Sequence, residues 1–283
     1  MLTIEKLSNG KILDVDIIES NTELQTIGHH RNEYYKIFVV LDGKGYHCID
    51  FEDHLLSKFK VYFIQPGQIH SITKKPTKMY AISFKSEAIN VDYRSQSILN
   101  SLFFQHHSNQ PYISIDSSGL NIISNILEII RDELSRNVID YDIISDLFIG
   151  SLKFIYRYMP SRLPISVKDD RIVSLYSLIE QHMSEHKDVD FYSEKLSIGS
   201  KRLNQVTKEH LNKTVTQIIH EKIITETKRK LAFTNAPVKA ISIDMGFKDL
   251  GYFCRFYKKH TGESPKKFRD NWNSQQFQII QLN

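Results

Sequence analysis

The sequence predicts an α+β fold, in which an N-terminal antiparallel β-barrel precedes a helical segment and an all-α domain. Hydrophobic residues alternate with a period of two between Gly and Pro turns up to residue 84, and from residue 95 onward they recur at helical spacing. A chain of 283 residues also has room for more than one core. We therefore expect a barrel domain at residues 1–94, a helical segment with a linker at 95–165 and a helical domain at 166–283.

The composition is that of an ordinary globular protein with a basic C-terminal part. Hydrophobic residues make up 41% and charged residues 25% of the chain, which argues against disorder. From Arg171 onward 19 Lys and Arg stand against 12 Asp and Glu, as in a module that binds a polyanion. No apolar run has the length of a signal peptide or a membrane span, so we expect a cytoplasmic protein without a membrane partner. Cys48 and Cys254 fall in different predicted domains, and both thiols are expected to be reduced.

Short apolar runs fill the predicted barrel. Residues 37–41 are a candidate for a fully buried strand, and residues 46–51 alternate as a second strand. Two further strands are expected at residues 61–64 and 79–84. Many short strands with Gly and Pro turns predict a small antiparallel barrel or a double-sheet jelly roll.

The segment after the barrel has two amphipathic helices, predicted at residues 122–134 and 143–155. Each apolar stripe is wider than one neighbouring element covers, so the helices are a candidate element for homodimerisation. Packing of both helices on their own barrel is the alternative. Residues 160–164, which begin and end with proline, break the helix and predict a stiff linker.

A helix-turn-helix is predicted at about residues 238–262. Gly246 supplies the left-handed residue that ends the first helix, and Asp249 is a good cap for the second. Gly262 ends the second helix, and Ser264-Pro265 then begins a last helical turn. A second helix held in this way fits a DNA major groove.

An earlier stretch repeats this pattern at an offset of 50 residues, so that Asn212 aligns with Gly262. A first helix-turn-helix is therefore predicted at about residues 190–212, with Asp190 as the cap of its first helix. The apolar series of residues 215–233 predicts a connecting helix of about 28 Å. That length would place both second helices in successive major grooves on one face of DNA.

The outward faces of the two second helices supply the candidate DNA contacts. They are Lys201, Arg202, Asn204, Gln205 and Lys208 on the first, and Leu250, Gly251, Tyr252, Arg255, Lys258 and Lys259 on the second. An amide can read adenine and a guanidinium can read guanine. The expected base readers are Lys201, Asn204, Gln205, Tyr252 and Arg255. The expected phosphate contacts include Lys258, Lys259, Lys266, Lys267 and Arg269. A solvated helical hairpin within a larger core is the alternative for this stretch.

A set of residues at fixed spacings marks the C-terminal stretch. They are Gly246-Phe247, Asp249, Tyr252-Phe253, Arg255, Lys258-Lys259, Thr261-Gly262, Ser264-Pro265 and Phe268-Arg269. This set resembles the signature of AraC/XylS-family transcription regulators. The resemblance implies a sequence-specific regulator, expected to be an activator, whose partners are double-stranded DNA, RNA polymerase and an unidentified small-molecule effector. A non-specific nucleoid protein is disfavoured, since the two units carry distinct polar residues.

A second set lies along the first strands of the barrel, at residues 30–36, Asp42-Gly43 and residues 65–70. It resembles the cupin effector-binding domain of many AraC-type regulators, which implies a small-molecule cavity. The candidate lining residues are His30, Arg31, Tyr34, Tyr35, Lys36 and His70. Their cations favour an acidic or phenolic ligand, although the alternation of a strand places about half of such side chains outside.

Neither a metal nor another cofactor is expected. Cupin enzymes hold a metal with three His and one Glu or Gln, whereas only His30 and His70 stand at ligand positions here. Asn32 and Lys36 occupy the other two positions, and an ammonium group repels a divalent cation. The alternative function, a cupin-fold metal-dependent enzyme with an accessory helical domain, is therefore disfavoured, and no catalytic residue is assigned.

Overall fold

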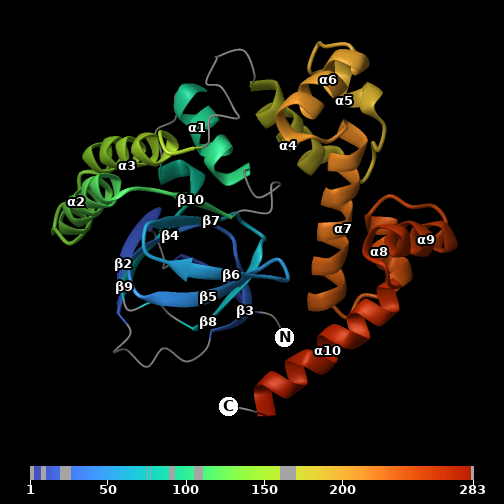
Figure 1. The fold of residues 1–283 in the computed structure, drawn as a ribbon, viewed down its shortest axis with the longest axis horizontal. Helices are drawn as coiled ribbons and strands as arrows, with labels where there is room; N and C mark the ends of the chain where they lie inside the picture. Colours follow the sequence, from blue (N-terminus) through green and yellow to red (C-terminus); the bar gives the residue numbers. More distant parts are fainter. Residues whose placement is uncertain are drawn as a thin grey trace. The chain divides into compact units, whose positions relative to one another are not determined.

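The computed structural model describes residues 3–7, 11–19, 27–74, 76, 78–88, 93–104, 111–159 and 170–281. The chain divides into two compact units, Leu2–Pro164 and Ile165–Asn283. The first contains sheets and helices and the second contains helices (Figure 1), so the predicted α+β class is confirmed. The predicted linker at residues 160–164 lies outside the described residues.

Two five-stranded sheets form the β part of the first unit. We call the sheet with strand order β1-β3-β8-β5-β6 the outer sheet, and the sheet with order β10-β7-β4-β9-β2 the inner sheet. The strands are β1 (Thr3–Glu5), β2 (Leu13–Glu19), β3 (Ile27–Asn32), β4 (Tyr35–Asp42), β5 (Lys44–Ile49), β6 (Glu52–Ser57), β7 (Lys60–Ile64), β8 (Ile69–Lys74), β9 (Lys78–Phe84) and β10 (Tyr112–Ser114). Among the described strands, β1 and β3 pair in parallel, which is an exception to the predicted antiparallel pattern. Of the two predicted architectures, the structure is the double-sheet form.

The inner sheet is buried on both faces, which explains the continuous apolar run at residues 37–41. Ile37 and Val39 pack against the helices, whereas Phe38 and Val40 pack between the two sheets. A strand covered on both faces needs no polar alternation.

Helices cover the face of the inner sheet that is turned away from the outer sheet (Figure 1). They are α1 (Tyr93–Phe104), α2 (Ser117–Leu134) and α3 (Tyr141–Tyr156), and the short helix η1 (Ser86–Ala88) precedes them. The two predicted amphipathic helices are confirmed as α2 and α3. Strand β10 was not predicted, because a run of three residues carries too little periodicity.

The second unit consists of helices only over its described residues. They are α4 (Asp170–His182), α5 (Val189–Lys195), α6 (Ser200–Leu211), α7 (Val215–Phe233), α8 (Val238–Asp244), α9 (Leu250–Thr261) and α10 (Pro265–Gln281). The predicted cap of α5 is wrong by two residues, since Asp188 accepts from the Phe191 N–H, whereas Asp190 accepts from the Ser200 hydroxyl. The last helix is also far longer than the single turn that was expected. No helix in the described part of the chain is long and apolar enough to cross a bilayer.

Candidate nucleic-acid interface and ligand site

The two helix-turn-helix units repeat one another element by element. Helices α6 and α9 each have 12 residues, and each ends at a left-handed residue, Asn212 with φ 54° and Gly262 with φ 83°. The hydroxyls of Thr214 and Ser264 then accept from the backbone N–H three residues later. The same caps at the same offset place α6 and α9 at equivalent positions, so the predicted duplication is confirmed. Figure 1 shows α7 running between the α5–α6 pair and the α8–α9 pair.

The turn of the second helix-turn-helix is held against the segment that follows α4. Gly246 has φ +74°, and a Cβ at this position would lie 1.6 Å from the carbonyl oxygen of Ser184. The Lys187 ammonium donates to Ser184 O at 2.9 Å and to Gly246 O at 3.2 Å. It also lies 4.9 Å from the centre of the Phe247 ring. This contact fixes the turn between α8 and α9 relative to the end of α4.

Helix α7 makes a further set of contacts with its neighbouring helices. Its Lys222 ammonium is buried and lies 3.0 Å from Glu180 on α4 and 3.6 Å from Glu226 on its own helix. Nearer the C-terminal end of α7, the Lys230 ammonium pairs with Asp244 on α8 at 3.1 Å. These pairs connect the middle of α7 to α4 and its C-terminal part to α8.

Helix α9 presents a basic face with an apolar N-terminal end. Phe253, Phe256 and Tyr257 are buried, which turns the opposite face outward. The predicted contacts on this helix are all exposed, and they are Leu250, Gly251, Tyr252, Arg255, Lys258 and Lys259. A Cβ at Gly251 would lie 3.4 Å from Nη1 of Arg255, so the missing side chain leaves room around that guanidinium.

Helix α6 presents a smaller polar face at the equivalent positions. Its exposed predicted contacts are Lys201, Arg202, Gln205 and Lys208. The Gln205 amide donates to the Glu209 carboxylate at 2.7 Å. With the offset of 50 residues, Gln205 stands at the place of Arg255, and Lys208 at the place of Lys258.

The structure differs from the prediction that Asn204 is one of the outward groups, because this residue is only partly exposed. Its amide nitrogen donates to Ser200 O at 3.1 Å, and its amide oxygen accepts from the Val215 N–H at 3.1 Å. Both ends of the amide are thus occupied, and the side chain ties α6 to the start of α7. The equivalent residue in α9 is Cys254, which is also only partly exposed. The offset of 50 residues, which can be found in the sequence, therefore indicates that Asn204 lies at the side of its helix and not at the centre of the outward face.

Arg269 is a second correction. Its guanidinium donates from Nε to Leu231 O at 3.1 Å and from Nη2 to Ala236 O at 2.8 Å. These acceptors lie at the end of α7 and in the connection to α8, so the side chain caps a helix end. The prediction of a phosphate contact is therefore wrong for Arg269, whereas Lys266 and Lys267 are exposed.

In the N-terminal compact unit, Leu2–Pro164, the alternation of strand β3 places some of the predicted ligand residues inside and others outside. His30 and Asn32 are buried and Arg31 is exposed. The proposed role of Arg31 as a lining residue is therefore wrong, because its side chain points away from the other candidates. His30, Tyr34, Lys36 and His70 remain as one group: the His30 and His70 rings lie 4.2 Å apart, and Lys36 lies over the Tyr34 ring.

A buried hydrogen-bonded chain passes through His70. The Asn32 amide donates to its Nε2 at 2.8 Å, so the ring hydrogen of neutral His70 is on Nδ1. That Nδ1 then donates to Nε2 of His47 at 3.0 Å. Burial, together with the neighbouring His47, lowers the pKa of His70 well below its ordinary value. Because both ring nitrogens are engaged within the protein, His70 has no nitrogen left for a metal ion. Across the described residues, no cluster of three or more His, Cys, Asp or Glu is arranged to hold one.

Glu5 on β1 completes the group and was missed by sequence reasoning. Its carboxylate accepts from the Tyr34 hydroxyl at 3.3 Å. The same Oε2 atom lies 3.6 Å from Nε2 of His30 and 3.9 Å from Nζ of Lys36. Burial lowers the pKa of Lys36, and the Glu5 carboxylate opposes that shift. A strand of three residues gives no periodic signal, so the sequence offered no means of placing Glu5 here.

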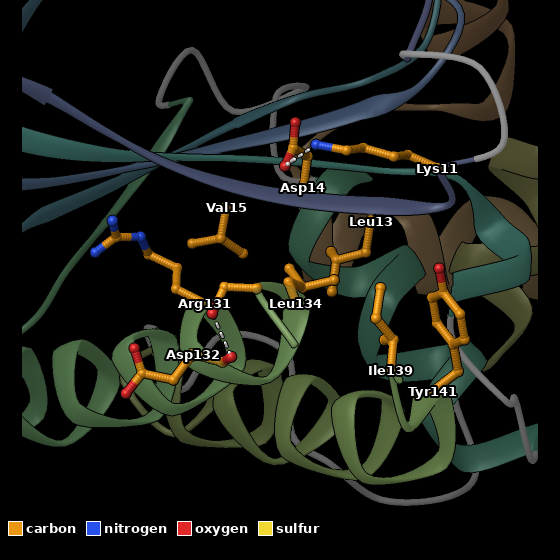
Figure 2. A pocket seen from close by; sticks show the side chains of 10 residues that line it. Lys11, Leu13, Asp14, Val15, Arg131, Asp132, Leu134, Ile139 and Tyr141 are labelled. Atoms are coloured by element: carbon orange, nitrogen blue, oxygen red, sulfur yellow. Dashed lines mark hydrogen bonds and ion pairs between the residues drawn. The ribbon is translucent and has the colours of Figure 1, made fainter. Parts of the chain in front are cut away.

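A cavity of about 400 Å³ lies elsewhere in the first unit, between β2 and the end of α2 (Figure 2). Its apolar lining is Leu13, Val15, Leu134, Ile139 and Tyr141, and its polar lining is Lys11, Asp14, Arg131, Asp132 and Ser135. Lys11 pairs with Asp14 at 3.0 Å, and Arg131 pairs with Glu128 at 3.0 Å. Each of the two cations thus has a carboxylate partner.

Comparisons with known proteins match both units. A family model for an AraC-like ligand binding domain matches residues 12–138, and a model for a helix-turn-helix domain matches residues 192–271. The HTH-type transcriptional activator RhaR of Escherichia coli (strain K12) is 19% identical over 250 residues, which are 87% of this chain and 88% of that protein. ToxT from Vibrio cholerae is 13% identical, with a TM-score of 0.44 over 92% of this chain and 98% of that chain. The C-terminal domain of the response regulator yesN from Fusobacterium nucleatum is 26% identical, with a TM-score of 0.33 over 34% of this chain and 94% of that one.

Proposed function

The chain belongs to the AraC family of transcription regulators, and on that premise we propose that it activates transcription by binding a specific DNA sequence with both helix-turn-helix units. The proposal of an activator is supported by the related RhaR proteins, which are named as transcriptional activators. An activator acts together with RNA polymerase, which is therefore the proposed protein partner. Double-stranded DNA is the proposed nucleic-acid partner.

The observation that carries this proposal is the pair of equivalent helices α6 and α9, joined by one helix. Helix α7 has 19 residues, which corresponds to about 28 Å at 1.5 Å per residue. One turn of DNA measures about 34 Å, so α6 and α9 enter successive major grooves on one face of the duplex. Lys208 and Lys258, at equivalent exposed positions, contact phosphates and set the register.

The residues that read bases differ between the two units. Arg255 on α9 is suited to the O6 and N7 atoms of guanine, and Gln205 on α6 is suited to adenine. The exposed apolar groups Leu250 and Tyr252 are suited to a thymine methyl group. Lys201 and Arg202 lie at the N-terminal end of α6, near either bases or phosphates. Asn204 and Arg269 are not proposed as base or phosphate contacts, because their polar groups bond within the protein.

The first unit is proposed to bind a small-molecule effector beside His30, Tyr34, Lys36 and His70, with the Tyr34 hydroxyl and the Lys36 ammonium as the groups that contact it, because both ring nitrogens of His70 bond within the protein. His30, Tyr34 and His70 are buried, and the Tyr34 hydroxyl and the Lys36 ammonium are donors, which favours an acidic ligand. Binding would then alter how the first unit restrains the DNA-binding unit.

Helices α2 and α3 are proposed to form a homodimer contact. Their inner faces pack on the inner sheet, as the alternative prediction had it. Ile129 and Ile143 remain exposed on their outer faces, so a second copy of the chain would bury apolar surface there.

The experiment that tests the DNA-binding proposal is selection of bound duplexes from a random library by the full-length protein, followed by competition against random DNA. We expect an enriched sequence that binds at least about 10³-fold more tightly than random duplex. Equal affinity for the enriched and random duplexes would refute sequence-specific binding.

A further inference from the structure

Glu5 brings a carboxylate from the N-terminal strand to two donor groups and a buried His ring in the first unit. The Glu5 Oε2 atom lies 3.3 Å from the Tyr34 hydroxyl, 3.6 Å from Nε2 of His30 and 3.9 Å from Nζ of Lys36. Tyr34, His30 and Lys36 come from β3, β4 and the turn between them. The Tyr34 hydroxyl and the Lys36 ammonium are donors that meet at one oxygen, and together they form a site for an anion.

These groups are held in place by burial. His30 is 3% and Tyr34 5% exposed, and the Lys36 side chain is 14% exposed. The His30 Nδ1–H donates to Gly28 O at 3.1 Å, and burial lowers the pKa of His30, so Nε2 of the neutral ring faces Glu5 without a hydrogen to donate. The Lys36 ammonium lies between the rings of Tyr34 and Phe38, at 5.8 and 5.6 Å from their centres. An ammonium in such surroundings needs a carboxylate partner.

Glu5 itself is held less firmly than the groups it contacts. Its side chain is 37% exposed. Strand β1 has only three residues and lies at the edge of the outer sheet, where it pairs with β3 alone. Its contacts of 3.3 to 3.9 Å are long, since a charge-assisted hydrogen bond usually measures about 2.7–2.9 Å. A free carboxylate, which is not tied to a strand, can approach the same donors more closely.

We propose that Tyr34 and Lys36, beside the buried His30 ring, form a carboxylate-binding site, and that Glu5 occupies it as an internal competitor which a small-molecule carboxylate displaces. This inference rests on the proposed ligand-binding role of the first unit and names the chemical class of the ligand. A neutral sugar or alcohol would bring no charge to replace Glu5 beside Lys36, which would leave only the more distant influence of Asp16, so it is disfavoured. Displacement of Glu5 also releases β1 from the sheet edge, which links ligand binding to the start of the chain.

Calorimetric titration of the full-length protein with benzoate and octanoate, beside the uncharged benzamide and octanamide, tests the proposal. We expect the wild type to bind the carboxylates and not the amides. Glu5→Gln removes the competing charge, so it should tighten carboxylate binding about threefold or more. Lys36→Met should abolish the binding, and Lys36→Arg should retain part of it. Lys11→Met, at the cavity of Figure 2, is the matched control and should leave the affinity unchanged.

Hydrogen exchange gives a second readout, in which residues of β1 should exchange faster when benzoate is bound. The proposal is overturned if no carboxylate binds, if the amides bind equally well, if Glu5→Gln fails to tighten binding, or if Lys11→Met abolishes it. Circular dichroism of each variant identifies a failure to fold. If Lys36→Met does not fold, the proposal is still tested by Glu5→Gln, which should bind carboxylates more tightly, and by Lys36→Arg, which should bind them less tightly. Binding of DNA is measured separately, so a failed carboxylate site leaves the DNA-binding proposal intact.

Discussion

Replacing Gly246 by Ala is expected to destabilise the helical unit much more than the same replacement at Gly262. Both glycines are left-handed, with φ of +74° and +83°. They differ in their surroundings: a Cβ at residue 246 would lie 1.6 Å from Ser184 O, whereas nothing lies within 4 Å of a Cβ at residue 262. Gly262→Ala therefore isolates the backbone cost, and Gly246→Ala adds the cost of separating the turn from α4.

The magnitudes follow from these two contributions. A left-handed Ala costs about 1–2 kcal/mol, which is the whole expected effect of Gly262→Ala. Overpacking against a backbone carbonyl adds about 1–3 kcal/mol, so Gly246→Ala should lower the free energy of unfolding by about 2–5 kcal/mol in total. Since Ser184 O is a backbone atom, no side-chain rotation can relieve the clash.

Fluorescence of Trp272 during urea unfolding measures both effects. This residue is the single Trp of the chain and belongs to the helical unit, where it is buried and packs against Phe233. Its emission therefore reports unfolding of this unit alone. Equal losses of stability for Gly246→Ala and Gly262→Ala would refute the close contact between the turn and α4.

Further predictions concern DNA contacts and pH. Arg255→Ala should cost about 1–3 kcal/mol on the selected sequence and little on random duplex, while Lys258→Ala should weaken both and lower the salt slope by about 1; equal losses on both DNAs for Arg255→Ala would contradict its role as a base reader. Asn204→Ala should lower the free energy of unfolding by about 1–3 kcal/mol, because it leaves the Val215 N–H unpaired; unchanged stability with an altered base preference would contradict the capping role. The pKa of His70 is lowered in the folded unit, so the unfolded chain binds more protons below pH about 6.5 and stability should fall there by up to about 1.4 kcal/mol per pH unit. Calorimetry of wild type and His70→Gln checks this, and an equal slope in both would contradict it.

The helix boundaries of the C-terminal compact unit could be predicted because the residues that end and cap a helix lie next to it in the sequence. Gly246 and Gly262 adopt the left-handed conformation expected at a helix end, and Asp249 accepts from the Tyr252 N–H at 2.6 Å. A cap depends on residues within one turn, which a sequence displays directly. The offset of 50 residues between the units likewise holds for both second helices.

The partners of long polar side chains could not be predicted in the same way. Arg269 lies among exposed Lys residues in the sequence, yet its acceptors are 33 and 38 residues earlier in the chain. Asn204 bonds to the backbone 11 residues later. Whether such a side chain caps a helix or faces DNA depends on how the helices pack, and periodicity carries no information on that.

The ligand group around Lys36 was half predicted. Alternation along β3 separates His30 from Arg31 once the strand and its face are known, but the sequence did not indicate which face was inward. His47 joins the group through a pairing of β5 with β8, and Glu5 through a pairing of β1 with β3. Sheet order is set by long-range packing, so these members could be found only from the structure.

The most direct test of the central claim is a hydroxyl-radical footprint of the full-length protein on its selected duplex. Simultaneous engagement of α6 and α9 predicts two protected tracts on one face, about 10 base pairs apart. Gln205→Ala should weaken protection in one tract, and Arg255→Ala should weaken it in the other. A single protected tract, or a footprint in which both replacements affect the same base pairs, would contradict the account.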